Sequence, residues 1–204
     1  MVFDEGRTVS EAALRQAVEQ SGFTTNRIVA PRSSSGANRN VKLSAEEKQL
    51  LSIPKKDFRN RQYQASLEAA QKAAEKLPES SEVHQFLSLC YFATGRYEDA
   101  RDAAHRALHL GQPWKWKQLK SHYVASKEYT KQLRHFERYL RDEEKTEEYG
   151  LLLGYHYWML GHLKVAEKEF TKAIQHAPND ELFQKLLEQL RKTAESNAQK
   201  KGSR

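Results

Sequence analysis

Residues 147–180 read EEYGLLLGYHYWMLGHLKVAEKEFTKAIQHAPND, a block of 34 residues whose pattern decides the fold. Apolar residues recur at helical spacing on both sides of Gly161, which predicts two amphipathic helices joined by a turn at the glycine. When the block is numbered from 1 to 34, small residues stand at positions 8, 20 and 27, namely Gly154, Ala166 and Ala173. Small side chains let two helices approach closely, so the block predicts a helical hairpin.

The same spacing recurs at steps of 34, 32 and 34 residues toward the N-terminus. One step back, the pattern returns at Leu119, Tyr123, Tyr129 and Phe136. A second step reaches Leu87, Ser88, Tyr91, Gly95, Tyr97, Ala100 and Ala107, and a third reaches Tyr63, Ala73 and Pro78. A fixed period of this length predicts hairpins that stack in series.

This spacing resembles the tetratricopeptide repeat, which has an aromatic residue at positions 11 and 24, alanine at 20 and 27, and proline at 32. The resemblance implies an all-α fold, a right-handed α-solenoid of about three and a half helical hairpins with a C-terminal capping helix. It also implies a non-enzymatic scaffold that binds another protein in a concave groove lined by the first helices. The blocks WKW (114–116), YTKQLR (129–134) and LLLGYHY (151–157) resemble a bacterial group within the family.

Two units depart from this pattern. In the middle unit, Lys120, Gln132 and Tyr139 replace the small residues, so we expect its two helices to be forced apart or the unit to be distorted. In the first unit, Pro54 falls where the first helix should continue, so we expect only the second helix of that unit to be regular.

Local signals predict where helices begin and end. Ser44 and Glu47 form the pattern of a capping box. Pro113 is predicted to lie in the first turn of a helix after a stop at Gly111. Asn179 and Asp180 are expected to cap a last helix, whose apolar face consists of Leu182, Phe183, Leu186, Leu187 and Leu190.

The chain is predicted to divide into an N-terminal strand and helix fragment (1–25), a flexible linker (26–43), the repeat domain (44–192) and a disordered basic tail (193–204). The stretch VFDEGRTVSEAALRQAVEQSGF resembles the closing half of a heavy-metal-associated domain, without the CxxC loop that holds the metal in that family. If the recorded start lies inside a longer gene that encodes such a loop upstream, residues 1–25 would be half of a metal-responsive domain. A short amphipathic helix is the alternative interpretation of the same residues.

Composition excludes several classes of protein. The 204 residues include one cysteine, Cys90, so an internal disulfide or a CxxC motif is excluded, and we expect a small buried residue there. No uncharged apolar run approaches the ~18 residues of a membrane span, so a cytoplasmic protein with no membrane partner is expected. The sequence contains neither a glycine-rich phosphate loop nor a GxSxG motif, so we predict no enzyme, no catalytic residue and no cofactor.

Positions within the repeat predict which residues face the groove and bind a partner. These residues are Gln85, Leu89, Phe92, Trp114, Lys117, Lys120, Ser121, Leu151, Tyr155 and Trp158. The expected partner is a peptide or acidic segment of another protein, with lysine attracting acidic residues and Phe92 or Trp158 accepting an apolar anchor. The alternative for Tyr155 and Trp158 is burial against the final helix.

The positive charge is concentrated in residues 113–141, which hold eight Lys or Arg and two Glu of a chain with net charge +7. Six aromatic residues alternate with them, a combination that also serves nucleic acids, so binding of RNA or single-stranded DNA is the alternative function. A solvated helix face explains the same charges, and self-association is a further possibility. His105 and His109, four residues apart on one helix, supply only two of the usual four metal ligands, so no metal is predicted.

Overall fold

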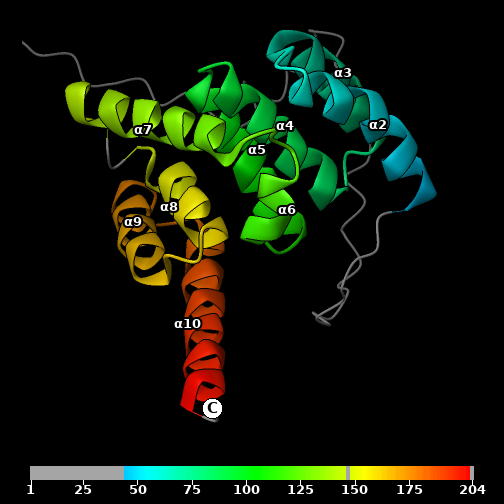
Figure 1. The fold of residues 1–204 in the computed structure, drawn as a ribbon. Helices are drawn as coiled ribbons and strands as arrows, with labels where there is room; N and C mark the ends of the chain where they lie inside the picture. Colours follow the sequence, from blue (N-terminus) through cyan, green and yellow to red (C-terminus); the bar gives the residue numbers. More distant parts are fainter. Residues whose placement is uncertain (1–43, 146–147, 203–204) are drawn as a thin grey trace, which may run out of the picture. The chain divides into compact units, whose positions relative to one another are not determined.

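The computed structural model describes residues 44–145 and 148–202, and in this part of the chain the secondary structure is helical without strands. Figure 1 shows the helices in chain order. They are α2 (Ala45–Arg59), α3 (Tyr63–Lys76), α4 (Ser81–Ala93), α5 (Tyr97–Leu110), α6 (Trp116–Lys120), α7 (Ser126–Asp142), α8 (Gly150–Met159), α9 (Leu163–His176) and α10 (Glu181–Gly202). The all-α prediction is confirmed. The predictions for residues 1–25 and 26–43 lie outside the described residues.

Helices α8 and α9 form the hairpin that the 34-residue block predicts. Their close approach depends on glycine, because a Cβ atom at Gly154 would stand 2.6 Å from the Phe170 ring. A Cβ atom at Gly150 would stand 2.5 Å from the backbone oxygen of Glu169. Helices α4 and α5 form an equivalent hairpin, in which the Ser88 hydroxyl at the small position donates a hydrogen bond of 2.8 Å to the Ala100 carbonyl.

The turns of the complete hairpins share one backbone feature. Gly95 and Gly161 have φ angles of +76° and +80°, a conformation that glycine adopts without steric cost. Arg61 occupies the corresponding position between α2 and α3, with φ of +64°. Its guanidinium pairs with the carboxylate of Glu128 on α7, an interaction that connects this turn to the middle unit.

The first hairpin has two regular helices, so the prediction that only its second helix is regular is wrong. Pro54 lies inside α2 and is buried. A proline in a helix interior costs about 3 kcal/mol because it removes one hydrogen bond and crowds the preceding turn. Burial of Leu51 and Phe58, each 1% exposed, anchors α2 on both sides of the proline. The Ser66 hydroxyl also donates a hydrogen bond of 2.8 Å to the Pro54 carbonyl.

The middle unit is distorted, as its missing small residues predict. Its first helix is reduced to α6, five residues long, whereas α7 has 17 residues. Pro113 lies in an irregular segment, and the next helix begins only at Trp116, so the prediction of a first-turn proline is wrong. With bulky residues at all three small positions, a regular close hairpin cannot form here.

Helix α7 instead lies across the neighbouring hairpins (Figure 1). Its buried face repeats at helical spacing and consists of Tyr129, Leu133, Phe136 and Leu140. The Phe136 ring packs 4.6 Å from Tyr97 of α5 and 5.5 Å from Phe92 of α4, measured between ring centroids. Helix α8 packs directly against α5, so the last hairpin contacts the second hairpin on the far side of the irregular unit.

The last helix, α10, packs against α9 through the predicted leucine and phenylalanine residues, all of which are buried. The Asp180 carboxylate accepts a hydrogen bond of 2.9 Å from the Leu182 N–H, which confirms the expected cap. The helix continues to Gly202, ten residues beyond the expected boundary at residue 192. Residues 193–202 are rich in Ala, Glu, Gln and Lys, which favour helix, so they extend α10 in place of the expected disordered tail.

Replacement of Gly154 should test the close contact of α8 and α9. We expect Gly154→Val to lower the free energy of unfolding by about 2–3 kcal/mol, because the added side chain overlaps the Phe170 ring. The matched control is Gly161→Asn, at a turn glycine with nothing within 4 Å of its Cβ position, where asparagine tolerates positive φ. Urea unfolding of both variants would measure the difference; equal destabilisation would contradict the packing argument.

Candidate partner-binding surface

Most of the residues predicted to face a groove are buried. Gln85, Leu89 and Phe92 of α4 are at most 4% exposed. Trp114 and three residues of α8 are also buried, and these three are Leu151, Tyr155 and Trp158. The remaining three predicted residues, Lys117, Lys120 and Ser121, are exposed. Seven of the ten are therefore inaccessible to a partner in this structure, including Phe92 and Trp158, which were expected to accept an apolar anchor.

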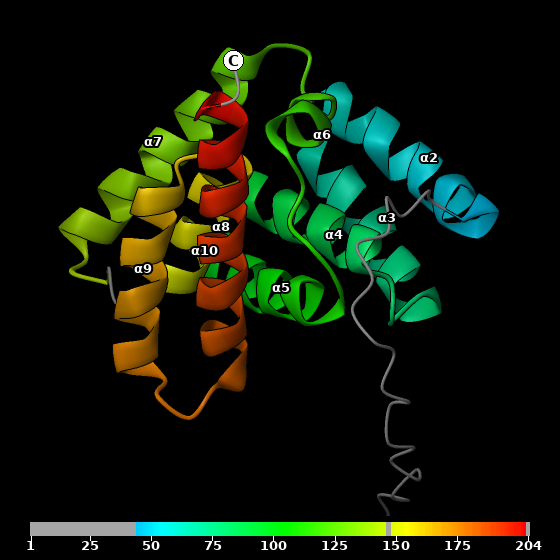
Figure 2. The ribbon, with the colours of Figure 1, turned by 90° about the horizontal axis from the view of Figure 1, so that it is seen from below.

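The chain covers this face with its own residues 111–123, called the covering segment below. Figure 2 shows its first part leaving α5 and running along α4 to α6. The Trp114 N–H donates to Gln85 Oε1 at 2.7 Å, and the Trp114 indole N–H donates to Glu82 Oε2 at 2.6 Å. Gln85 Nε2 in turn donates to the Gln112 carbonyl at 3.1 Å. Backbone and side chain of the covering segment thus occupy the hydrogen-bonding groups of α4.

Aromatic rings continue this cover toward α2 and α8. His122 packs 4.6 Å from Trp114 and 5.3 Å from Phe86, and Tyr123 packs 5.1 Å from Phe58, between ring centroids. On α8, the Tyr155 hydroxyl donates to Gln85 Oε1 at 3.2 Å. The groove prediction assumed that every unit keeps a full first helix. Because that helix is short in the middle unit, the residues of the covering segment can pack against α4.

His156 of α8 completes the filled face. Its ring stands 4.0 Å from the Phe92 ring, and its Nδ1 is 3.1 Å from the Tyr129 hydroxyl. Its Nε2 has no hydrogen-bond partner and is buried. Burial lowers the pKa of His156 to about 3, so the ring is neutral at physiological pH. For His122, burial and then the charges of Lys55 and Arg59 lower the pKa to about 3 as well.

Helix α6 and the two residues before it present lysines to solvent because their apolar neighbours are anchored inward. Trp114 and Leu119 are 3% and 0% exposed, and half-buried Trp116 packs 5.8 Å from the Tyr129 ring. The intervening Lys115, Lys117 and Lys120 are all exposed. These three residues, called the lysine surface below, make no ion pair with any described residue.

Burial also limits the alternative of nucleic-acid binding by residues 113–141. Stacking on bases requires accessible ring faces. Four of the six aromatic side chains in this segment are at most 6% exposed, namely Trp114, Tyr123, Tyr129 and Phe136. Trp116 and Tyr139 are half-buried against the core. The charges of the segment remain accessible, but its rings do not form a stacking platform.

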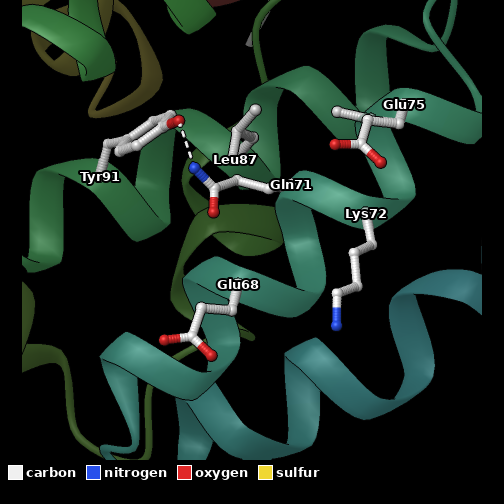
Figure 3. Close-up of a pocket in the computed structure, with 7 residues that line it drawn as sticks. Glu68, Gln71, Lys72, Glu75, Leu87 and Tyr91 are labelled. Atoms are coloured by element: carbon white, nitrogen blue, oxygen red, sulfur yellow. Dashed lines mark hydrogen bonds between the residues drawn. The ribbon is translucent and has the colours of Figure 1, made fainter.

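A hollow on the described surface lies between α3 and α4 (Figure 3). It has a volume of about 610 Å³ and is lined by Glu68, Gln71, Lys72, Ala74, Glu75, Leu87 and Tyr91. Gln71 Nε2 donates to the Tyr91 hydroxyl at 2.9 Å, as Figure 3 shows. The charged groups of Glu68, Lys72 and Glu75 do not converge on one point in this view. The hollow therefore has no organised set of catalytic groups.

Cys90 is the small buried residue that the sequence predicts. It is 0% exposed, and its Sγ stands 3.3 Å from the Ser66 hydroxyl. Burial raises the pKa of the thiol to about 12, so it stays protonated near neutral pH. A protonated and enclosed thiol is a poor nucleophile.

His105 and His109 of α5 acquire a third polar neighbour that their spacing did not reveal. Asp180, 75 residues from His105, places its Oδ2 2.6 Å from His105 Nε2. Burial acts to raise the pKa of Asp180, but hydrogen bonds from His105 and from the Leu182 N–H outweigh it and lower the pKa. Only the folded chain brings these residues together, where the start of α10 lies next to α5. The one sequence signal for this contact is that Asp180 stands at position 34 of the repeat block, two residues after Pro178, where the next helix begins.

The recurring hairpins define an all-α helical-repeat protein, and the comparisons with known proteins specify which repeat it contains. Residues 57–122, about a third of the chain, match the tetratricopeptide repeat family. The match spans α3 to α6, and the α8–α9 hairpin repeats the same spacing beyond it. The chain therefore contains a tetratricopeptide repeat region at residues 57–122. The sequence matches no curated protein.

In the described part of the chain, no helix combines the length and apolarity needed to span a bilayer.

The two buried histidines should make the fold sensitive to acid. In an unfolded chain each histidine has a pKa near 6.5, so between about pH 6.5 and 3 the unfolded state binds more protons than the folded state. The free energy of unfolding should therefore fall with decreasing pH, by about 1.4 kcal/mol per pH unit for each histidine.

Denaturant unfolding between pH 7 and 5 checks this expectation. His122→Phe and His156→Phe should each flatten the pH dependence, whatever their effect at pH 7. His135→Phe, at an exposed histidine of α7, is the control and should leave the slope unchanged. If both core variants kept the wild-type dependence of the free energy of unfolding on pH, other groups would cause the acid sensitivity.

Proposed function

We propose that this protein is a binding scaffold that captures an acidic segment of a partner protein on the lysine surface of α6. Tetratricopeptide repeats generally mediate protein–protein interactions, and the family is generally non-enzymatic. The observation that carries the proposal is the exposure of Lys115, Lys117 and Lys120 on an element whose other side is fixed by Trp114 and Leu119.

The electrostatics of the segment favour an anionic partner. Residues 113–141 hold eight Lys or Arg and two Glu, a local excess of six positive charges. Exposed charges attract an approaching acidic chain and are screened over roughly 8 Å at physiological salt, so binding should weaken as salt is added. The covering segment is held by Gln85 and Glu82, so the lysines are presented from a fixed backbone and little ordering is needed on binding.

The groove mechanism expected from the sequence is replaced in this proposal. A peptide could enter the face of α4 and α8 only by displacing the covering segment, with loss of the hydrogen bonds of Trp114 and burial of its indole. A partner that binds α6 from outside needs no such rearrangement. Of the ten predicted partner-binding residues, Lys117, Lys120 and Ser121 therefore remain in the proposed site, and Lys115 is added.

Charge reversal tests the proposal. We expect the triple variant Lys115→Glu, Lys117→Glu, Lys120→Glu to lose the partners that wild type retains in affinity purification from the native cell, because it replaces attraction by repulsion. For a purified partner, the Kd should rise more than tenfold. The matched control, Lys72→Glu, Lys164→Glu, Lys168→Glu, changes net charge equally at exposed positions of α3 and α9 and should keep the partners.

The outcomes separate the candidate functions. Partners that persist with the α6 variant, or that are lost equally with the control, would contradict the proposal. Capture that disappears after nuclease treatment, with a steep dependence of affinity on salt, would favour the nucleic-acid alternative. Circular dichroism of both variants should match wild type, since all six lysines are exposed.

A further inference from the structure

Two histidines of α5 and the capping aspartate of α10 form a cluster of metal-ligating groups. His105, His109 and Asp180 each offer one ligand atom, and these atoms all lie within 4.8 Å of one another. The histidines are one helical turn apart on the same face, with ring centroids separated by 4.7 Å. The cluster consists of two residues of α5 and the residue that caps α10. It shares no residue with the lysine surface and does not depend on the proposed function.

The aspartate is oriented for a ligand role by its cap. Asp180 Oδ1 accepts the Leu182 N–H at 2.9 Å, whereas Oδ2 faces His105 Nε2 at 2.6 Å. One oxygen is thus held by the backbone, and the other is directed toward the imidazoles. Polar partners that fix the orientation of a ligand are a common property of metal sites in proteins.

We propose that His105, His109 and Asp180 bind a divalent first-row transition metal of the zinc class. Two imidazole nitrogens and one carboxylate oxygen suit Zn²⁺ and Co²⁺, whereas Ca²⁺ and Mg²⁺ prefer sites made of oxygen alone. With bonds of about 2.0–2.1 Å, tetrahedral ligands stand roughly 3.3 Å apart. The exposed side chain of His109 rotates to close the remaining distance, and water completes the coordination.

The surrounding charges permit a cation at this position. Arg106 and Lys185 are cationic side chains whose charges act on His109, and each pairs with a carboxylate, Glu79 and Glu181 respectively.

Binding would connect two elements that otherwise meet through few contacts. The histidines belong to the second hairpin and Asp180 to the N-terminus of α10. A metal held by both would fasten the last helix to the middle of the array. A ligand that binds only the folded chain raises its thermal stability. We therefore expect metal to stabilise the protein by holding α10 against α5.

Cobalt titration tests the site directly. The full chain, without a histidine tag and freed of metal by a chelator, should bind one Co²⁺ at low concentration and develop a visible absorption band. At a free metal concentration ten times the Kd, Zn²⁺ should raise the Tm by roughly 3–6 °C. Absence of saturable Co²⁺ binding up to millimolar concentration would overturn the proposal.

The variants separate ligation from folding. His109→Ala removes an exposed ligand, and Asp180→Asn retains an oxygen for the Leu182 N–H while it removes the charged ligand. Each should weaken Co²⁺ binding at least tenfold and abolish the Zn²⁺-dependent rise in Tm. His135→Ala, at an exposed histidine of α7, is the matched control and should bind like wild type. Equal Co²⁺ affinity in wild type and His109→Ala would assign the metal to other residues and overturn the proposal.

Discussion

Close packing of paired helices is the constraint on which the rest of this structure depends. Where Gly154, Ala166 and Ala173 stand at the facing positions, α8 and α9 approach so closely that a Cβ atom added at Gly154 would overlap the Phe170 ring. Where Lys120 and Tyr139 stand instead, no regular hairpin forms, and the chain takes a different path. Residues 111–123 then cover α4, and α7 crosses the adjacent hairpins. One local failure of packing thus determines which surfaces remain accessible.

The sequence predicted elements whose packing is local and failed where packing involves distant residues. The turn glycines, the Ser44 capping box and the leucine face of α10 follow from spacing alone, and the structure confirms them. The helix through Pro54 could not be foreseen, because its stability depends on burial against later residues. The buried groove residues were missed for the same reason: burial of Gln85 depends on Trp114, 29 residues away, whose position no repeat pattern specifies.

The candidate sites differ in how far sequence could locate them. The lysines of α6 are visible as a concentration of charge, and only the anchoring of Trp114 and Leu119 shows that they face outward. The aromatic residues beside them suggested base stacking until burial removed most of the rings from solvent. Asp180 could not be joined to the histidine pair from spacing, since the contact arises only where the start of α10 lies next to α5 in the folded chain.

The covering segment also affects how cooperatively the helices unfold. In a regular repeat protein each hairpin contacts only its neighbours, so the ends can unravel while the centre stays folded. Here α7 contacts both α4 and α8, and Trp114 and Tyr155 meet at Gln85 from elements far apart in the chain. Loss of any one of these elements exposes the core of the others. Residues 44–145 and 148–202 should consequently melt as one cooperative unit, in the manner of a small globular enzyme rather than a string of independent modules.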